Sequence, residues 1–411
     1  MLPAMGITVD RSTTLDPAPL DAADPLASFA DRFVATEPGL IYLDGNSLGR
    51  PTKAAVERIN ALAEAWSKRL IRGWDDGWMD LPLTVGDLLA TGVLGARAGE
   101  VAVTDSTTVN IYRLASAALD ARPGRRTIVI ERSEFPTDRY IVEGLARERE
   151  LEVRWLDGDP FEGLATDDIV STFDSDTALL ILSALNYRSS AVIDMKPVTD
   201  AARAAGAFVL WDLSHAAGSV PVDLEANGAD LAVGCTYKYL NGGPGSPAFL
   251  YVRRELQDEL RPPIQGWFAQ REQFEMGPTF RRQPGIAGWL VGTPGVISLI
   301  SCQAGVEVVA EAGIGAIRDK GVALTEYAID LVDAWLAPLG CSIGSPRDSS
   351  RRGAHVSIRH AEAKRLVQRL VEQDVIVDFR APDSIRIGLS PLTTSFEDVH
   401  HGLAALRDLL A

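Results

Sequence analysis

Two apolar runs that end abruptly at polar residues constrain the fold of this chain more than any other feature. Residues 207–211 (AFVLW) lead directly into Asp212 and, three positions on, His215. Residues 231–235 (LAVGC) lead into a polar stretch that contains Lys238. In an open α/β sheet, ligands bind beyond the carboxyl ends of parallel strands. We therefore expect Asp212, His215 and Lys238 to meet at one crevice.

Pyridoxal phosphate accounts for this set of side chains. The cofactor requires a lysine for a Schiff base, an acid that keeps its pyridine nitrogen protonated, and donors for its phosphate. Lys238 and Asp212 match the first two requirements, and the Gly- and Pro-containing turn at 241–245 allows backbone to approach a ligand closely. Taken singly, such an Asp is often only a helix cap and such a Lys only a solvated side chain. Their combination with the turn favours the cofactor.

Size and charge limit the classes of function. The chain has 411 residues, more than the roughly 250–300 at which single cores stop growing, so two domains are expected. Hydrophobic residues make up 46% and charged residues 23%, which is ordinary for a globular protein. The net charge of −16 argues against binding to nucleic acid, because neutralising phosphates requires clustered Lys and Arg.

The sequence indicates no export signal, membrane segment, disulfide framework or metal site. Residues 1–31 lack a basic start followed by an apolar segment, and no run reaches the roughly 18 apolar residues of a membrane helix. Cys235, Cys302 and Cys341 are widely spaced, and no pair of His residues has a carboxylate at metalloprotease spacing. We expect a cytoplasmic protein that binds neither a metal nor a membrane.

A second polar cluster lies at an expected helix start. A short strand at 100–104 is followed by DSTTVN at 105–110 and by an amphipathic run to about residue 121. Hydroxyls at a helix start cap the helix, and the free N–H groups with the positive end of the dipole can bind a phosphate. Capping explains one hydroxyl, so three in succession leave capping and phosphate binding both open.

The rest of the first 300 residues alternates between strands and helices. Strands are expected at 40–44, 126–132, 151–156 and 177–185, and helices at 52–69, 135–149 and 196–206. Such alternation predicts an α/β fold whose mostly parallel sheet is covered by helices on both faces. Residues 257–295 are irregular, and a stretch of that length is typically functional rather than a plain connection.

The C-terminal part has a different pattern. One long amphipathic helix is expected after residue 298, followed by short strands at 355–358, 375–378 and 385–389 that alternate with helices. This pattern predicts a smaller α+β domain. We assign residues 52–300 to a large cofactor-binding domain, and residues 1–51 with 301–411 to the small domain. Residues 1–30 are expected to form a loose arm with one short helix.

The chain resembles the kynureninase family, which are pyridoxal-phosphate enzymes with the aspartate-aminotransferase fold (fold type I). The resemblance runs from YLDGNSLG at 42–49 to SIRIGLSPL at 384–392, so it covers nearly the whole chain. It implies a homodimer that binds a small amino-acid substrate. The implied reaction is hydrolysis of L-kynurenine, or 3-hydroxykynurenine, to anthranilate, or 3-hydroxyanthranilate, and L-alanine in tryptophan catabolism.

The resemblance also implies roles for individual residues. Lys238 matches the Schiff-base lysine, Asp212 the partner of the pyridine nitrogen, and Tyr237 a tyrosine that reaches the phosphate and relays protons. Arg386 matches the arginine that binds the substrate α-carboxylate, a group that suits a bidentate guanidinium, and Arg188 is the next candidate. The further cofactor contacts implied are Phe135, stacked on the ring, Asp138, His215, Thr107, Thr108 and Ser183, with Trp267 and Thr293 contributed by the second subunit.

The chain departs from the family pattern in two places. Ala269-Gln270 replaces the common Gly-His after the Gly-Trp-Phe triplet at 266–268, and Ile193 stands where bacterial members often have His. These departures leave open a related pyridoxal-phosphate lyase that acts on a modified kynurenine or another amino acid in secondary metabolism. A cofactor-binding regulator without turnover is a third hypothesis. The retention of all the catalytic and substrate-binding candidates argues against that regulator.

Overall fold

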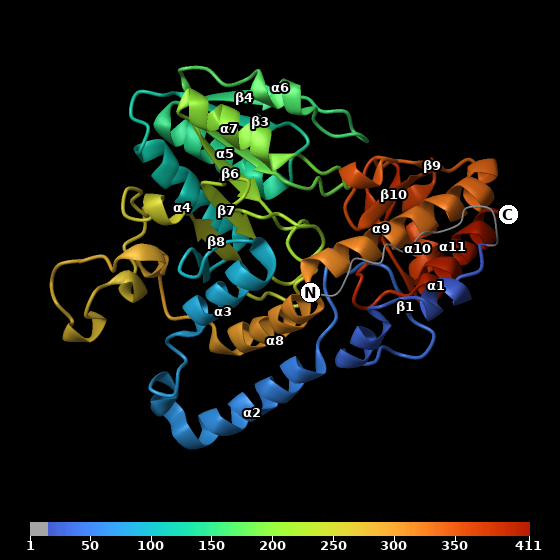
Figure 1. The fold of residues 1–411 in the computed structure, drawn as a ribbon, viewed down its shortest axis with the longest axis horizontal. Helices are drawn as coiled ribbons and strands as arrows, with labels where there is room; N and C mark the ends of the chain where they lie inside the picture. Colours follow the sequence, from blue (N-terminus) through green and yellow to red (C-terminus); the bar gives the residue numbers. More distant parts are fainter. Residues whose placement is uncertain (1–14) are drawn as a thin grey trace.

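A seven-stranded sheet forms the centre of the larger part of the molecule (Figure 1). The computed structural model describes residues 15–411, so the first 14 residues of the expected arm lie outside the described residues. The strand order is β2-β8-β7-β6-β5-β3-β4. The strands are β2 (Val101–Val103), β3 (Thr127–Glu131), β4 (Glu152–Leu156), β5 (Thr177–Ser183), β6 (Phe208–Asp212), β7 (Leu231–Gly234) and β8 (Phe249–Val252).

The predicted mostly parallel sheet is confirmed. Strands β3 to β7 pair in parallel, and only β8 runs antiparallel to its neighbours β2 and β7. The central strands are buried on both faces, which explains why their sequences are continuous apolar runs rather than alternating ones. Strand β4 lies at one edge of the sheet beside β3, and β5 pairs with the opposite side of β3. The direction in which successive strands are added to the sheet therefore reverses after β4.

Helices cover both faces of this sheet (Figure 1). One core contains side chains of α4 (Thr107–Asp120) and α5 (Pro136–Arg149), and the other contains side chains of α3 (Leu81–Leu89), α7 (Met195–Ala205) and α8 (Val296–Ala312). The second core also includes Leu26, Phe33 and Ile317 from outside the range assigned to the large domain. The division into residues 52–300 and the remainder stays a prediction.

A four-stranded antiparallel sheet of order β12-β13-β10-β9 forms the centre of the C-terminal part. Its strands are β9 (Ser342–Ile343), β10 (His355–Arg359), β12 (Asp378–Arg380) and β13 (Ser384–Gly388), and its helices are α9 (Ile314–Leu331), α10 (Ala363–Val371) and α11 (Phe396–Leu410). Near the amino end, α1 (Ala18–Ala22) precedes the short strand β1 (Ile41–Tyr42), which pairs in parallel with β11 (Val375–Ile376). Residues close to both ends of the chain therefore lie in this part.

Two expected elements are divided in the structure. The prediction of one strand at 375–378 is wrong, because this stretch is divided between β11, which pairs with β1, and β12, which pairs with β13 in the other sheet. The prediction of a single long helix after residue 298 is also wrong. This part of the chain forms two helices, α8 and α9. The helical path is broken at Gly313, whose φ of +80° lies in the left-handed region that glycine adopts readily. As a result, α8 and α9 point in different directions.

The stretch between β8 and α8 is irregular, as expected. It contains only short 3-10 turns, among them Trp267–Ala269 and Gly285–Trp289, and it extends away from the sheet at the left of Figure 1. The helix α2 (Lys53–Arg69) projects from the lower side of the same view. Among the described residues no single helix is long and apolar enough to cross a membrane, although Val296–Ala312 and Ile314–Leu339, bent by 82°, pass that test as a pair.

Candidate active site

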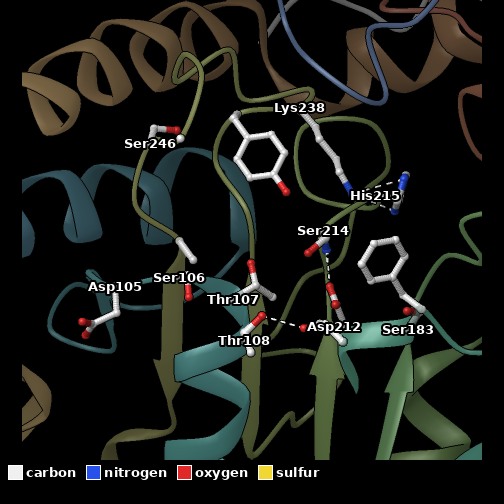
Figure 2. A pocket seen from close by; sticks show the side chains of 15 residues that line it. Asp105, Ser106, Thr107, Thr108, Ser183, Asp212, Ser214, His215, Lys238 and Ser246 are labelled. Atoms are coloured by element: carbon white, nitrogen blue, oxygen red, sulfur yellow. Dashed lines mark hydrogen bonds between the residues drawn. The ribbon is translucent and has the colours of Figure 1, made fainter. Parts of the chain in front are cut away.

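A pocket opens at the carboxyl ends of β5, β6 and β7, beside the start of α4 (Figure 2). It lies where the sheet meets the loops that follow its parallel strands, which is the position expected for a ligand in such a fold. The residues that line it are Asp105, Ser106, Thr107, Thr108, Phe135, Thr137, Ser183, Asp212, Ser214, His215, Tyr237, Lys238, Gly245, Ser246 and Ala248. The lining combines one amine, one imidazole, two carboxyl groups and several hydroxyls.

Lys238 is buried in this pocket and faces His215 (Figure 2). Its Nζ lies 3.2 Å from Nε2 and 3.3 Å from Nδ1 of His215, and 5.8 Å from the ring centroid of Phe135. Burial lowers the pKa of Lys238, an effect that the nearby Arg386 increases and the charge of Asp212 opposes. The pKa of His215 lies well below its usual value because of burial and the charge of Lys238. His215 is therefore a neutral imidazole at physiological pH.

Asp212 is the last residue of β6 and is 5% exposed. The backbone N–H of Ser214 donates to its Oδ1 at 2.6 Å, so the loop after the strand holds the carboxyl group in place. Burial raises the pKa of Asp212, whereas the hydrogen bonds from Ser214 and the charge of Lys238 oppose that rise. A buried acid held in this way can keep a ring nitrogen protonated if that nitrogen lies beside it.

Hydroxyl groups gather at the start of α4. Ser106 is the N-cap and accepts a hydrogen bond from the N–H of Val109, and the hydroxyls of Thr108 and Thr137 lie 2.6 Å apart. The buried Ser246 lines the same pocket, from the loop after β7. An N-terminal helix end surrounded by hydroxyls favours an anionic group, because its N–H donors and dipole face the pocket.

Two buried carboxyl groups, those of Glu134 and Asp138, flank Phe135 in the sequence but do not line the pocket. Phe135 immediately precedes α5 and is 37% exposed, whereas Asp138, in the first turn of α5, is completely buried. Neither carboxyl oxygen of Asp138 has a hydrogen-bond partner among the described residues. Burial raises the pKa of Asp138 well above its usual value, and the charges of Asp212 and Glu134 increase that effect.

Arg386 reaches the same region from β13. It is 1% exposed, its Nε donates to Oδ1 of Asp378 at 3.0 Å, and its Nη1 donates to the carbonyl of Tyr187 at 2.6 Å. The same Nη1 lies 3.4 Å from Nε2 of His215. Arg386 thus does not face solvent, and it pairs with Asp378.

Two predicted residues lie elsewhere in the described chain. Trp267 is 42% exposed and Thr293 is exposed, and both belong to the irregular stretch that extends from the sheet. The indole N–H of Trp267 donates to the carbonyl of Gln273 at 3.1 Å. Neither residue lines the pocket formed by its own chain.

The curated relatives of this chain are kynureninases. It is 42% identical over 407 residues to kynureninase from Pseudomonas fluorescens, with 97% of this chain and 96% of the relative covered. It is 44% identical over 399 residues to kynureninase from Burkholderia pseudomallei, with 95% and 94% covered. Residues 317–406 match the family model described as the kynureninase C-terminal domain. The chain belongs to the kynureninase family.

Solved structures share the fold at lower identity. A cysteine desulfurase from Thermococcus onnurineus NA1, in its apo form, has a TM-score of 0.79 and 17% identity, with 97% of this chain and 99% of that chain covered. A variant of C-DES with glycine covalently linked to its PLP cofactor has a TM-score of 0.79 and 19% identity, with 90% and 97% covered. The predicted fold type I architecture is confirmed.

The two departures from the kynureninase pattern lie outside the pocket. Ala269 is buried, and the side-chain oxygen of Gln270 accepts a hydrogen bond from the N–H of Arg281 at 2.6 Å, within the irregular stretch. Ile193 packs against the core beneath the large sheet. None of these three side chains lines the pocket.

Several residues of the kynureninase pocket escaped sequence reasoning. Thr137, Ser214 and Ser246 line it, and they lie in or near the segments that connect strands, Thr137 in the first turn of α5, Ser214 just after β6 and Ser246 between β7 and β8. That position was the available signal, but such hydroxyls are common in loops. Glu134, which is 1% exposed, gave no signal because nothing in its local sequence indicates burial. No group of three or more His, Cys, Asp or Glu that could hold a metal occurs within residues 15–411.

Proposed function

We propose that this protein uses pyridoxal phosphate to hydrolyse L-kynurenine, or 3-hydroxykynurenine, to anthranilate, or 3-hydroxyanthranilate, and L-alanine. One observation carries the proposal. The buried amine of Lys238 and the carboxyl of Asp212 line one pocket with the hydroxyls of α4, in a chain 42% and 44% identical to two kynureninases over nearly its whole length. Family membership supports the reaction, and the pocket supports the cofactor.

The residues of the pocket fit this cofactor. An aldehyde needs an amine, which Lys238 provides, and a phosphate needs the helix N-terminus with the hydroxyls of Thr107 and Thr108. Asp138 does not line the pocket, but its two buried carboxyl oxygens lack a partner among the described residues, which supports a role toward a group that binds nearby. Phe135 offers a ring for stacking, and Ser183, Tyr237 and His215 complete the proposed contacts.

When bound, pyridoxal phosphate supplies a carbonyl for imine formation and a protonated ring that withdraws electrons from the substrate Cα. Asp212 would hold the proton on the ring nitrogen. Lys238, whose pKa is lowered by burial, would be free to remove the proton from Cα. Arg386 would bind the α-carboxylate and so fix the direction of the bonds at Cα.

The remaining steps require water and a proton. Hydrolysis breaks the Cβ–Cγ bond, the oxygen of water goes to the γ-carbon to form the aryl carboxylic acid, and Cβ receives a proton to become the methyl group of alanine. Tyr237 and Lys238 line the pocket together and are the candidates to donate that proton. The neighbouring Cys235 and burial raise the pKa of Tyr237, so its hydroxyl carries a proton at neutral pH.

We further propose a homodimer in which Trp267 and Thr293 contact the cofactor of the partner subunit. Both residues are exposed and neither lines the pocket of its own chain, which supports a role outside their own chain. Exposed apolar side chains on α2 and the turn after it also support an interface, among them Trp66, Leu70 and Ile71 at 58%, 62% and 76% exposed. Closed two-fold symmetry is the common arrangement for shared sites.

The proposal includes two further points. Residues 52–300 form the large domain and residues 1–51 with 301–411 the small one, which supplies Arg386 to the pocket region. The protein acts in the cytoplasm in tryptophan catabolism, which its lack of a disulfide framework supports.

The decisive experiment is a turnover assay. Purified protein is incubated with pyridoxal phosphate and either L-kynurenine or 3-hydroxykynurenine, and the aryl acid and alanine are quantified by fluorescence and chromatography. Equimolar anthranilate and alanine are expected from kynurenine. Binding of pyridoxal phosphate without release of either product would contradict the proposed reaction.

A further inference from the structure

Glu134 is a buried carboxyl group next to the pocket that the proposed reaction does not use. It lies between β3 and α5 and is 1% exposed. Its Oε1 accepts the N–H of Phe135 at 2.8 Å and the hydroxyl of Ser183 at 2.6 Å, and its Oε2 accepts the N–H of Ser183 at 2.7 Å. One carboxyl group therefore joins two segments of the pocket wall that are 49 positions apart in the chain.

These hydrogen bonds act where the backbone needs an acceptor. Phe135 is the N-cap of α5 and makes no side-chain cap hydrogen bond, and Pro136 follows it. Ser183 is the last residue of β5. The chain enters α5 after Phe135 and leaves β5 after Ser183, so the orientation of both segments depends on contacts such as those of Glu134.

An ionised carboxyl group can accept hydrogen bonds from all three donors at once. An ionised carboxyl group is purely an acceptor, whereas an amide of the same shape would present N–H groups to one of these donors. Hydrogen bonds to a charged acceptor are also the stronger kind. Burial raises the pKa of Glu134 to about 7, with the charge of Glu131 next in importance, while the bonds from Ser183 and Phe135 oppose the rise.

We propose that Glu134 is a positioning residue for the cofactor site, which holds Phe135 and Ser183 in one arrangement before the cofactor binds. Phe135 and Ser183 line the pocket and Glu134 does not, so Glu134 acts through them. The inference rests on the proposed use of pyridoxal phosphate, and it extends that proposal to a residue outside the pocket lining. It does not depend on which amino acid is the substrate.

Three variants separate this role from simple loss of charge. Glu134→Gln keeps the shape but places donors against donors, and Glu134→Asp keeps the charge but is one methylene too short to reach both segments. Glu131→Gln is the matched control, since Glu131 is also buried, at 4% exposed, but its Oε1 accepts from the hydroxyl of Ser133 at 2.6 Å. The measurements are the Kd of the apoprotein for pyridoxal phosphate and the visible circular dichroism of the bound cofactor.

Glu134→Gln and Glu134→Asp should each weaken pyridoxal phosphate binding on the order of tenfold, since a hydrogen bond to a charged group contributes about 1.5–3 kcal/mol and 1.4 kcal/mol is tenfold. Both should also reduce the visible dichroism at saturating cofactor. Glu131→Gln should stay within about twofold of the wild type, because the hydrogen bond that Glu131 accepts comes from Ser133 and not from Phe135 or Ser183. Far-UV circular dichroism checks folding, and Glu134→Asp carries the test if Glu134→Gln does not fold.

The inference is overturned if Glu134→Asp binds the cofactor as the wild type does, or if Glu131→Gln weakens binding as much as Glu134→Gln. The first result would show that only the charge is needed, and the second that any buried carboxyl group in this region has the same effect. A wild-type protein that binds pyridoxal phosphate but leaves kynurenine intact would contradict the proposed reaction and leave this inference standing. A wild-type protein that does not bind pyridoxal phosphate would overturn both.

Discussion

Arg386 and Asp378 form a buried ion pair across the antiparallel strands β12 and β13. The two residues are direct partners in the strand register, Nε of Arg386 donates to Oδ1 of Asp378 at 3.0 Å, and Nη2 donates to Oδ2. Asp378 also receives a hydrogen bond from the hydroxyl of Ser47 at 3.1 Å. The guanidinium is thus held in one orientation before any substrate carboxylate arrives.

Arg386→Ala should lower kcat/KM for kynurenine on the order of 30-fold or more, because a lost charge-assisted pair costs about 2–5 kcal/mol. Cofactor absorbance should be retained, and steady-state kinetics with absorbance spectra check both. Asp378→Asn is the control, since it disturbs the ion pair but keeps the cation. Equal losses in the two variants, or loss of the cofactor in Arg386→Ala, would show that Arg386 is structural and would turn attention to Arg188.

Lys238 should carry the cofactor. Its amine is buried and lies 3.2 Å from a neutral imidazole, and burial lowers its pKa, so it is a better nucleophile at neutral pH than an exposed lysine. Borohydride reduction of the holoenzyme followed by peptide mapping should place the pyridoxyl group on the peptide that contains Lys238. Lys238→Ala should give no reduced adduct, and an adduct on another lysine would contradict the assignment.

Asp44 should make the stability of the protein depend on pH. Burial, and next the charge of Asp378, raise the pKa of Asp44 from 3.8 to about 6. The folded state therefore binds this proton more tightly than the unfolded state. The stabilisation is complete below pH 3.8 and is lost as pH rises through about 6.

Asp44→Asn should remove this dependence. Between pH 4 and pH 7 the wild type should lose on the order of 3 kcal/mol of unfolding free energy relative to the variant, from about 1.4 kcal/mol for each pKa unit. Urea unfolding at a series of pH values measures the difference between the two proteins. Parallel curves for wild type and variant across this range would contradict the role of Asp44.

A site shared between subunits should allow two inactive variants to complement each other. Lys238→Ala and Trp267→Ala should each be strongly impaired alone, because one lacks the amine and the other the contact from the partner. Co-expression should restore roughly a quarter of the wild-type activity, since half of the random dimers are mixed and each mixed dimer has one intact site of two. Activity equal to the mean of the two variants would mean that Trp267 acts within its own chain.

Parts of the fold were predictable because they depend on local sequence. Strands β5 to β7 are buried on both faces, so their sequences are continuous apolar runs, and the polar residues after them had to lie at the edge of the sheet where Asp212 and Lys238 are found. The capping serine before α4 was likewise visible in the sequence.

Other features depend on partners that are distant in the chain. Residues 375–380 form one extended stretch, and only pairing decides that β11 joins β1 while β12 joins β13. That pairing sets Asp378 opposite Arg386, a contact that the eight-residue spacing does not indicate. Glu134 bonds to Ser183 only because β3 and β5 are neighbours in the sheet.

The sequence by itself determined the parallel sheet and the amine and carboxyl groups at the strand ends, because hydrophobic periodicity and local polar residues specify these directly. Its motifs, from YLDGNSLG at 42–49 to SIRIGLSPL at 384–392, carried the resemblance to the family. Tertiary structure alone decided which charges are buried together. The pairing of Arg386 with Asp378, the contact of Lys238 with His215, and the bonds of Glu134 to Phe135 and Ser183 arise when strands and loops pack. The pKa values follow from that packing, since desolvation depends on everything that surrounds a group.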